Sequence, residues 1–256
     1  MTTFKAYARY YDLLYRDKPY ADEARYVVEL ARRHGCVPES LLELGVGTGA
    51  HAVHFLNLTR RVAGVDNSEG MLAAAEARRA TLAPADGERL SLHHGDVRSV
   101  RLKKRFSLVV SLFHVVSYQC PNDDVIAAFQ TAREHLDKGG LFIFDLWHGP
   151  GVLTEPPAVR VRRFRDEATE VERLAEPTLR SRENIVDVNY AIRVTDRRSE
   201  TTQLLIEKHE MRYFFEPELR HMLASASLEF IEALAWLSTD APTTRDWTAV
   251  VAARAV

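Results

Sequence analysis

The segment that joins Ser40 to Gly49 constrains the fold more than any other part of the chain. Its first five residues, Ser-Leu-Leu-Glu-Leu, read as a short strand that leads into Gly45 and Gly47, and a helical pattern follows over residues 50–58. Glycines between a strand and a helix permit positive φ and let the backbone approach a ligand closely. In an open parallel sheet, ligands collect beyond the carboxyl ends of the strands, where this loop falls. The sequence therefore predicts an α/β protein that binds a ligand at this loop.

The first 150 residues alternate helical and strand patterns, which favours a parallel sheet covered by helices. The spacing of apolar residues predicts helices over 20–34, 68–80 and 122–136 and strands over 62–65, 90–93, 106–112 and 141–146. Segment 106–112 is apolar almost throughout, as strands buried on both faces are. Lys138-Gly139-Gly140 is expected to end the third of these helices.

Beyond residue 150 the pattern changes to an alternation of apolar and polar residues, which is typical of antiparallel strands with one wet face. It occupies 159–164, 168–175, 185–194 and 201–214, and a helix over 216–226 and strands over 228–237 and 247–255 follow. We therefore expect a main domain of residues 1–150 and 215–256, with a β-rich insertion over 151–214 on the substrate side or at a dimer contact. Exposed strand edges can pair across a twofold axis, so a homodimer is compatible with this arrangement.

The composition narrows the class of partner. Hydrophobic residues make up 46% of the chain and charged residues 27%, which are ordinary values for a globular protein. A net charge of -2 gives no reason to expect a nucleic-acid or membrane partner. Without a signal-like segment or an apolar run of about 18 residues, a cytoplasmic protein is expected. The separated Cys36 and Cys120 suggest neither a disulfide nor a zinc site, and His93-His94 lacks a third ligand, so no metal is expected.

Two acidic residues follow the next two expected strands. Asp66 ends the second strand, where a carboxylate can accept both hydroxyls of a ribose. Asp96, in Gly95-Asp96, ends the third strand and can accept a hydrogen bond from an adenine amino group. Taken singly, Asp66 could equally cap a helix and Gly95-Asp96 could be a turn. The glycine spacing is G-x-G-x-G rather than the G-x-G-x-x-G of dinucleotide-binding enzymes.

Together these motifs resemble those of class I S-adenosylmethionine (SAM)-dependent methyltransferases, over roughly residues 5–150 and 216–256. The matching stretches are LLELGVGTG, VAGVDNSEGML, LHHGDVRSV, FSLVVSLFHVVSY and LDKGGLFIFDL. One departure is Val46, a position that is often cysteine in the family. The resemblance implies a Rossmann-like sheet of seven strands, six parallel and the last antiparallel, with helices on both faces.

The resemblance also implies where SAM would bind. The glycine loop would pass under the methionine moiety, Asp66 would hold the ribose, Met71 would lie against the adenine, and residues 111–114 would line the sulfonium side. The cofactor-binding residues expected on this basis are Tyr11, Glu43, Gly45, Gly47, Gly49, Asp66, Asn67, Met71, Asp96, Val97, Ser111 and Phe113.

The N-terminus is rich in tyrosine, with Tyr7, Tyr10, Tyr11, Tyr15 and Tyr20 within its first 20 residues. One interpretation is an amphipathic helix that packs its tyrosines on the core. The other is a lid over the site. The Y-D-x-x-Y arrangement is similar to that of methyltransferases acting on nucleotide-linked amino sugars, and sugar N,N-dimethyltransferases share both the stretch after the fourth strand and a β-rich insertion.

Several polar residues near strand ends are candidates for chemistry. His114 is the first candidate for a proton acceptor or substrate orienter, and Tyr11 and Tyr118 are further catalytic candidates. Tyr118 stands where the related sugar enzymes can present a histidine. Arginine forks in the insertion suit a phosphate, although a solvated strand face explains them as well. The substrate-binding candidates are Tyr15, Tyr20, His114, Tyr118, Asp145, His148 and Arg212.

The predicted function is SAM-dependent transfer of a methyl group to N or O of a small polar metabolite, and the resemblance suggests a nucleotide-linked amino sugar. Two alternatives stay open: N-methylation of a small amine such as glycine, and a catalytically silent SAM-binding module. An NAD-dependent dehydrogenase is disfavoured by the glycine spacing and by the lack of an obvious hydride-transfer pair.

Overall fold

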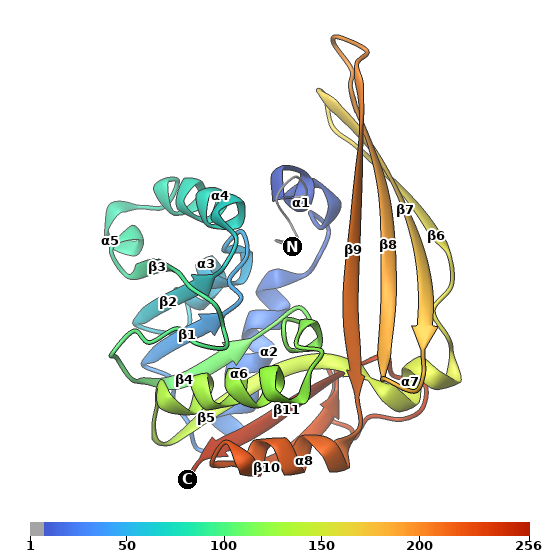
Figure 1. Cartoon of the computed structure of the whole chain (residues 1–256). Helices are drawn as coiled ribbons and strands as arrows, with labels where there is room; N and C mark the ends of the chain where they lie inside the picture. Colours follow the sequence, from blue (N-terminus) through green and yellow to red (C-terminus); the bar gives the residue numbers. More distant parts are fainter. Residues whose placement is uncertain (1–7) are drawn as a thin grey trace.

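The computed structural model describes residues 8–256, so Tyr7 of the tyrosine-rich N-terminus lies outside the described residues. Its centre is a sheet in the order β3-β2-β1-β4-β5-β11-β10 (Figure 1). Neighbours from β3 to β5 are parallel, whereas β11 is antiparallel to both β5 and β10, so only the last strand of the chain is reversed. This confirms the predicted sheet. Its strands are β1 (Ser40–Leu44), β2 (Arg61–Asp66), β3 (Leu90–His94), β4 (Phe106–Ser111), β5 (Leu136–His148), β10 (Leu228–Ala235) and β11 (Thr248–Ala255).

Helices connect the strands, and most begin and end within a few residues of the predicted limits. Ser68 is the N-cap of α4, because its side chain accepts a hydrogen bond from the Met71 N–H. The helices are α1 (Ala8–Leu14), α2 (Tyr20–Arg33), α3 (Ala50–Phe55), α4 (Glu69–Ala80), α5 (Pro84–Gly87), α6 (Asn122–Glu134), α7 (Gly149–Thr154) and α8 (Glu216–Ser225), with one 3-10 turn, η1 (Val116–Tyr118). Among residues 8–256, no helix combines the length and the apolar character that a membrane crossing needs.

The expected helix stop at Lys138-Gly139-Gly140 was wrong. Helix α6 already ends at Glu134, and β5 begins at Leu136, so the two glycines lie inside a strand. The pairing of β5 with β4 is irregular there, because the register shifts between Phe106 and Leu108 of β4. Gly139, with φ of 78°, supplies the left-handed backbone that this irregularity requires.

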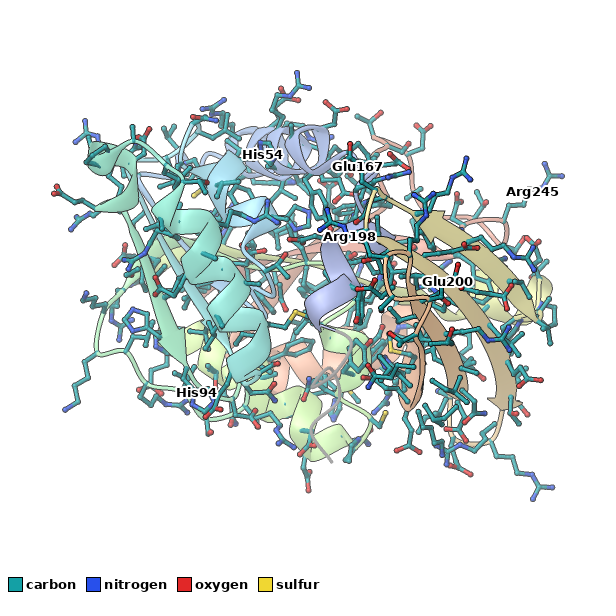
Figure 2. The ribbon with its side chains drawn as sticks, turned by 90° about the horizontal axis from the view of Figure 1, so that it is seen from above. His54, His94, Glu167, Arg198, Glu200 and Arg245 are labelled. Carbon is teal, nitrogen blue, oxygen red and sulfur yellow. The ribbon has the colours of Figure 1, made fainter. Side chains whose placement is uncertain are left out.

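A second, antiparallel sheet stands beside the carboxyl end of the first (Figure 1). It joins the central sheet where the end of β9 pairs with residues 147–148 of β5. Helix α1 lies between α4 and this second sheet, and the turns at the sheet's outer end carry Glu167, Arg198 and Glu200 (Figures 1 and 2). The division into a main domain and an insertion remains our proposal. The strands of the second sheet are β6 (Arg160–Arg165), β7 (Thr169–Arg180), β8 (Ile185–Asp196) and β9 (Thr202–Phe214).

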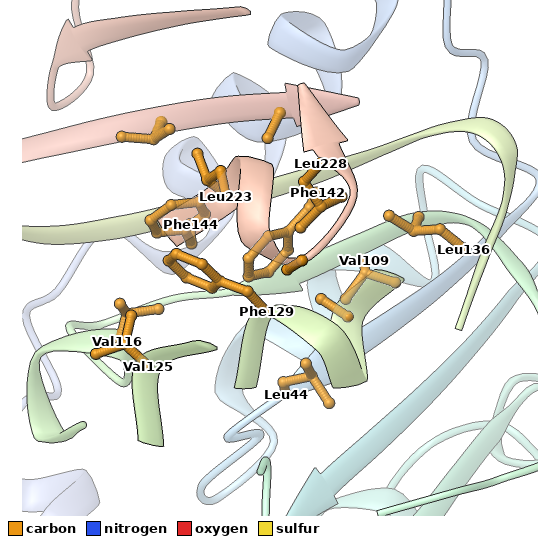
Figure 3. Close-up of a cluster of buried hydrophobic side chains, with 14 of the residues drawn as sticks. Leu44, Val109, Val116, Val125, Phe129, Leu136, Phe142, Phe144, Leu223 and Leu228 are labelled. Carbon is orange, nitrogen blue, oxygen red and sulfur yellow. The ribbon is translucent and has the colours of Figure 1, made fainter. Parts of the chain in front are cut away.

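Alternate residues of the central strands face opposite layers of helices. Leu41 belongs to the cluster with α2 and α3, whereas Leu42 belongs to the cluster with α6 and α8. In the second cluster, Phe129 of α6 packs against Phe142 and Phe144 of β5, which stack at 4.6 Å between ring centroids (Figure 3). Burial of such aromatic side chains fixes the sheet, and with it the carboxyl ends of the strands, in a rigid frame.

Candidate functional site

A single cavity of about 610 Å³ lies at the carboxyl ends of the central strands and extends to the second sheet. Its size is within the range of roughly 300–1,000 Å³ that small-molecule sites occupy. The glycine loop and the ends of β2 and β3 form one part of its wall, and the segment after β4 forms the middle. The inner face of the β6–β9 sheet forms the far wall, and tyrosines from the N-terminal region cover the cavity.

The three glycines of the loop all have left-handed backbones, with φ of 82° at Gly45, 54° at Gly47 and 76° at Gly49. A Cβ on Gly45 would collide with both Cγ atoms of Val115, whereas a Cβ on Gly47 would meet nothing within 4 Å. Gly45 and Gly47 line the cavity, but Gly49 does not. Gly49 precedes α3 and lies against Ala75 of α4, so its role is packing.

Asp66 ties the glycine loop to the end of β2. Its carboxylate accepts a hydrogen bond from the Gly47 N–H and another from the Ser68 N–H, each at 2.9 Å. Burial raises the pKa of Asp66 above its ordinary value. Asp66, Asn67 and Met71 all line the cavity, so the second-strand motif and the glycine loop meet in one place as expected.

Glu43 presents a buried acid to the same part of the cavity. The residue is 1% exposed, and its Oε2 has no hydrogen-bond partner within residues 8–256. The Nδ1 of His51 lies 3.6 Å from Oε1, too far for a hydrogen bond. Burial, followed by the charge of Asp66, raises the pKa of Glu43 well above its ordinary value. A buried oxygen of this kind can accept a hydrogen bond from a ligand.

Asp96 and Val97 line the cavity beyond β3, as expected. However, the Asp96 carboxylate is already engaged, because Arg98 donates to it from its backbone N–H at 2.8 Å and from Nη2 at 2.6 Å. These bonds lower the pKa of Asp96 and keep it ionised. A ligand amino group would have to share the carboxylate with Arg98, which also lines the cavity.

The turn after β4 places His114 at the centre of the wall. Phe113 and His114 have φ of 64° and 65°, which is rare for residues with side chains and costs about 1–3 kcal/mol each. Asp145 of β5 holds the turn, because it accepts the His114 N–H at 2.8 Å, and its Oδ2 lies 3.2 Å from the His114 Nδ1. Burial lowers the pKa of His114 and raises that of Asp145. His114 therefore faces the cavity as a neutral imidazole with a buried carboxyl group behind it.

Tyr118 stands next to His114 on the cavity wall and connects it to the second sheet. Its hydroxyl is 2.8 Å from the Nδ1 of His209 on β9, and the Nε2 of His209 is 2.9 Å from the Glu207 carboxylate. Both Tyr118 and His209 line the cavity.

Helix α1 and the tyrosines around it close the cavity. Leu14 packs with Val171 and Ile192 of the second sheet, while Asp12 accepts a hydrogen bond from Thr48 beside the glycine loop. Tyr15 and two further tyrosines, Tyr11 and Tyr20, line the cavity. Each interpretation therefore describes part of the N-terminal region: Leu14 packs on a core of the second sheet, whereas Tyr11, Tyr15 and Tyr20 line the cavity.

The far wall of the cavity is basic. Arg160 and Arg162 of β6 and Arg173 of β7 line it, and Arg173 also donates to the Tyr15 hydroxyl at 2.9 Å. Because side chains alternate along a strand, Arg163 points to the other face, where it pairs with Glu172. The wall thus presents guanidinium groups and tyrosine rings on one face of the second sheet.

Comparison with known proteins identifies this arrangement. Residues 41–140 match the sequence profile of a family described as "Methyltransferase domain". Residues 41–140 form a methyltransferase domain. The chain is 38% identical over 151 residues to the dTDP-3-amino-3,4,6-trideoxy-alpha-D-glucopyranose N,N-dimethyltransferase of Streptomyces venezuelae, a match that covers 58% of this chain and 60% of that relative. It is 27% identical over 223 residues to the dTDP-3-amino-3,6-dideoxy-alpha-D-glucopyranose N,N-dimethyltransferase of Streptomyces fradiae, covering 86% of this chain and 83% of the relative.

A solved structure shares the whole architecture of this methyltransferase. Streptomyces venezuelae DesVI superposes with a TM-score of 0.79 at 27% identity, covering 99% of this chain and 100% of that one. The sugar N-methyltransferase KedS8 from Streptoalloteichus, at 23% identity and a TM-score of 0.80, has the same fold, and the match covers 98% of this chain and 94% of that one. Both matches include the β6–β9 sheet as well as the methyltransferase core, since each covers nearly the full chain.

The cavity of this methyltransferase fits SAM. Glu43 offers an unpartnered buried oxygen to an ammonium group, and Asp66 offers an acceptor at the place expected for a ribose. Met71 and Val97 line the cavity with apolar side chains, which suit an adenine. Ser111 does not line the cavity, because its hydroxyl donates to the Leu44 carbonyl and joins β4 to β1.

Three expected substrate residues lie outside the cavity. Asp145 supports His114 from behind. The Nδ1 of His148 lies 3.0 Å from the Asp246 carbonyl, so this histidine faces the start of β11. Arg212 lies on the other face of β9, where it donates to the Cys120 carbonyl, to Asn122 and to Glu218. The alternation of side chains along β9 turns Arg212 away from the site, which corrects its expected role.

Sequence reasoning missed several residues of the cavity wall, and those with polar side chains are Thr48, His51, Arg98, Gln119, Asp124, Arg173 and Tyr190. The phase of β7 could have indicated Arg173, because it shares a face with the buried Val171 two residues earlier. His51 follows the glycine loop, and its Nε2 lies 2.6 Å from the Glu23 carboxylate of α2. No local signal in the sequence joins those two residues.

Proposed function

We propose that this methyltransferase transfers methyl groups from SAM to the amino group of a nucleotide-linked amino sugar. One observation carries the proposal: a single cavity runs from the glycine loop, past His114 and Tyr118, to a basic and aromatic face of the β6–β9 sheet. The two ends of the cavity suit different ligands, and the histidine and the tyrosine lie between them.

The basic wall favours a substrate that carries phosphate groups. The guanidinium groups of Arg160, Arg162 and Arg173 can each form two parallel hydrogen bonds with phosphate oxygens. The rings of Tyr15 and Tyr190 lie at 5.5 Å and 5.3 Å from the Arg173 guanidinium and offer flat surfaces to a base or a sugar. The two curated relatives act, by their names, on dTDP-linked amino sugars.

The chemistry needs little beyond alignment and exclusion of water. When bound, SAM supplies an electrophilic methyl group. Asp145 holds the His114 turn in one conformation, so that His114 can orient the substrate amine. The docking of α1 on the second sheet keeps water away from the reacting groups.

The first experiment measures transfer to matched acceptors. The purified protein is incubated with SAM and with dTDP-linked sugars that carry either an amino group or a hydroxyl group at the same carbon, and with the free amino sugar. We expect demethylated cofactor and methylated product only with the dTDP-linked amine, read by mass spectrometry. Transfer to the hydroxyl sugar instead, or SAM binding without transfer to any nucleotide sugar, would refute the proposal.

A variant pair tests the basic wall. Arg162→Gln removes one guanidinium from the cavity, and we expect the KM for the nucleotide sugar to rise about tenfold, since a charged hydrogen bond contributes roughly 1.5–3 kcal/mol. The affinity for SAM should not change. Arg163→Gln is the matched control, because that side chain leaves the same strand on the opposite face. Equal effects of the two substitutions would place the phosphate elsewhere.

Assembly and compartment belong to the same proposal. We infer a cytoplasmic homodimer, which would cover the exposed Val161, Leu204 and Ile206 on the outer face of the β6–β9 sheet. Sedimentation of the purified protein at micromolar concentration tests the dimer, and a monomer there would reject it. Fractionation of the producing cells tests the compartment.

A further inference from the structure

Tyr118, His209 and Glu207 form a connected row of polar groups that starts in the cavity. The Tyr118 hydroxyl is 2.8 Å from His209 Nδ1, and His209 Nε2 is 2.9 Å from Glu207 Oε2. Glu207 and His209 are two residues apart on β9, so both point to the inner face of the second sheet, where they pair with Tyr190 and Val188 of β8. Tyr118 and His209 line the cavity. The row thus leads from the cavity wall into the sheet.

The polar pair next to Tyr118, His114 and Asp145, is closed on its inner side. His114 is backed by Asp145, whose side chain is 3% exposed and whose two oxygens both face His114. The Glu207 side chain at the end of the Tyr118 row is 13% exposed. Each transfer of a methyl group to a neutral amine leaves the product nitrogen as a cation, and this nitrogen must lose a proton before it can accept a second methyl group. Among residues 8–256, the row that ends at Glu207 provides a route through side chains of the second sheet.

We propose that Tyr118, His209 and Glu207 carry the amine proton from the cavity to solvent, which rests on the proposed methylation of an amine. In this transfer the N–H bond of the amine breaks and an O–H bond forms at Tyr118. The original Tyr118 proton moves to His209 Nδ1, and the proton on His209 Nε2 moves to the Glu207 carboxylate. Glu207 then releases it to water. Charge and atoms balance, because one proton leaves the amine and one reaches the carboxylate. His209 then gives up its Nδ1 proton and takes one at Nε2, which restores the starting tautomer before the next transfer.

The surroundings favour concerted movement over an ionised tyrosine. Burial is the main cause that raises the pKa of Tyr118 well above its ordinary value, so the phenol keeps a proton at every stage. The charged and titratable groups around it are Tyr15, Arg173 of β7, Tyr190 of β8 and Glu207 of β9, with Arg162 of β6 acting on Tyr190. A hydroxyl that gains one proton while it loses another carries no net charge in this buried position.

Three variants interrupt the row at successive atoms while keeping side-chain volume: Tyr118→Phe, His209→Gln and Glu207→Gln. We expect each to lower kcat about tenfold or more at neutral pH, since positioned proton transfer contributes roughly 10²–10⁴-fold. The KM for SAM should not change. The loss should shrink as pH rises, because a methylated amine that leaves the cavity is then deprotonated in solution and can rebind for the second transfer without the relay.

Matched controls separate the row from general effects of substitution. Tyr213→Phe removes another buried tyrosine hydroxyl from β9, and Glu210→Gln neutralises an acid on the opposite face of the same strand. Both should keep the pH profile of the wild-type enzyme. Rates are also measured in mixtures of light and heavy water. A plot of the wild-type rate against the deuterium fraction should be curved, because several protons move together, whereas the plot for Tyr118→Phe should be linear.

Two results would overturn the relay. One is that the three variants lose thermal stability but keep the wild-type pH profile and isotope dependence, which would make the row a structural anchor between η1 and β9. The second needs no substrate: nitrogen NMR of His209 must show a protonated Nε2 and an unprotonated Nδ1 in the resting protein, and the opposite tautomer excludes the relay. A wild-type enzyme that methylates no amino sugar would instead refute the proposed function, and the NMR result would still decide the hydrogen-bond direction.

Discussion

Gly45 and Gly47 lie two residues apart in the loop, but an added side chain would collide with a neighbour only at Gly45. Gly45→Ala adds a methyl group that collides with Val115, in addition to backbone strain at φ of 82°. We expect its free energy of unfolding to fall by about 2–4 kcal/mol. Gly47→Ala meets no neighbour within 4 Å, so only strain of about 1–2 kcal/mol is expected. Urea denaturation of both variants measures the difference, and equal losses would contradict the contact with Val115.

A second prediction for a single residue concerns Asp66. Its two oxygens accept the Gly47 and Ser68 N–H groups, and an asparagine can accept only one of these bonds. Asp66→Asn should therefore loosen the glycine loop and weaken SAM binding about tenfold or more. Calorimetric titration with SAM measures this. Asp86→Asn is the control, because Asp86 pairs with Arg89 away from the cavity. Unchanged affinity would remove Asp66 from the cofactor site.

The residues that could be predicted from sequence are those whose position follows from a strand end. Asp66 and Gly47 are of this kind, because parallel strands bring their carboxyl ends to one edge. Arg212 is not, because its face depends on the phase of β9, which turns and bulges set. A shift of one residue along a strand would move each side chain from the cavity face of the sheet to its outer face. His51 was missed for another reason, since its partner Glu23 comes from a different helix.

Among the elements, α1 is held by residues far away in the sequence. Asp12 accepts hydrogen bonds from Thr48 and Arg78 at 2.7 Å each, and Leu14 on the same helix packs on the second sheet. The Asp12–Arg78 pair is half-exposed, so it contributes little to stability, at most about 1 kcal/mol. The pair does hold α1 over the cofactor end of the cavity.

Asp12→Asn should therefore change kinetics more than stability. We expect SAM to dissociate several-fold faster, while the free energy of unfolding changes by less than about 1 kcal/mol. Stopped-flow displacement of SAM by its demethylated product measures the dissociation rate. The control is Glu76→Gln, which removes a pair of similar exposure with Arg79 on α4. If both variants release SAM at the wild-type rate, α1 does not act as a cover.

The order of the elements was accessible from sequence, whereas their junctions were not. The pattern of apolar residues indicated every strand of both sheets, because period-two and continuous apolar runs reflect burial directly. The short α7, which crosses the expected boundary at residue 150, has no such pattern. Its Gly151 packs against the backbone of Asp246, a contact that depends on the position of β11 nearly 100 residues later.

At the scale of the whole molecule, Glu43 links stability to function through pH. Its ordinary pKa is 4.5, and burial followed by the charge of Asp66 raises the pKa in the folded protein. The folded protein thus holds a proton that the unfolded chain releases. The stability that Glu43 contributes is fully present below pH 4.5 and is lost as pH rises through the folded pKa. A ligand ammonium group beside Glu43 would recover this loss, because it favours the ionised form.

Glu43→Gln tests this link in both directions. Glutamine does not ionise, so the variant should match the wild type near about pH 4 and exceed it in free energy of unfolding by about 1 kcal/mol or more near about pH 8. The same substitution should weaken SAM binding, and most strongly at high pH, where the wild-type carboxylate is charged. Denaturation and calorimetry across this pH range measure both effects. Parallel stability curves would show that Glu43 titrates normally, and equal affinities would show that its free oxygen does not meet the cofactor. If both effects appear, the fold maintains a buried acid that destabilises the empty protein because the bound cofactor requires it.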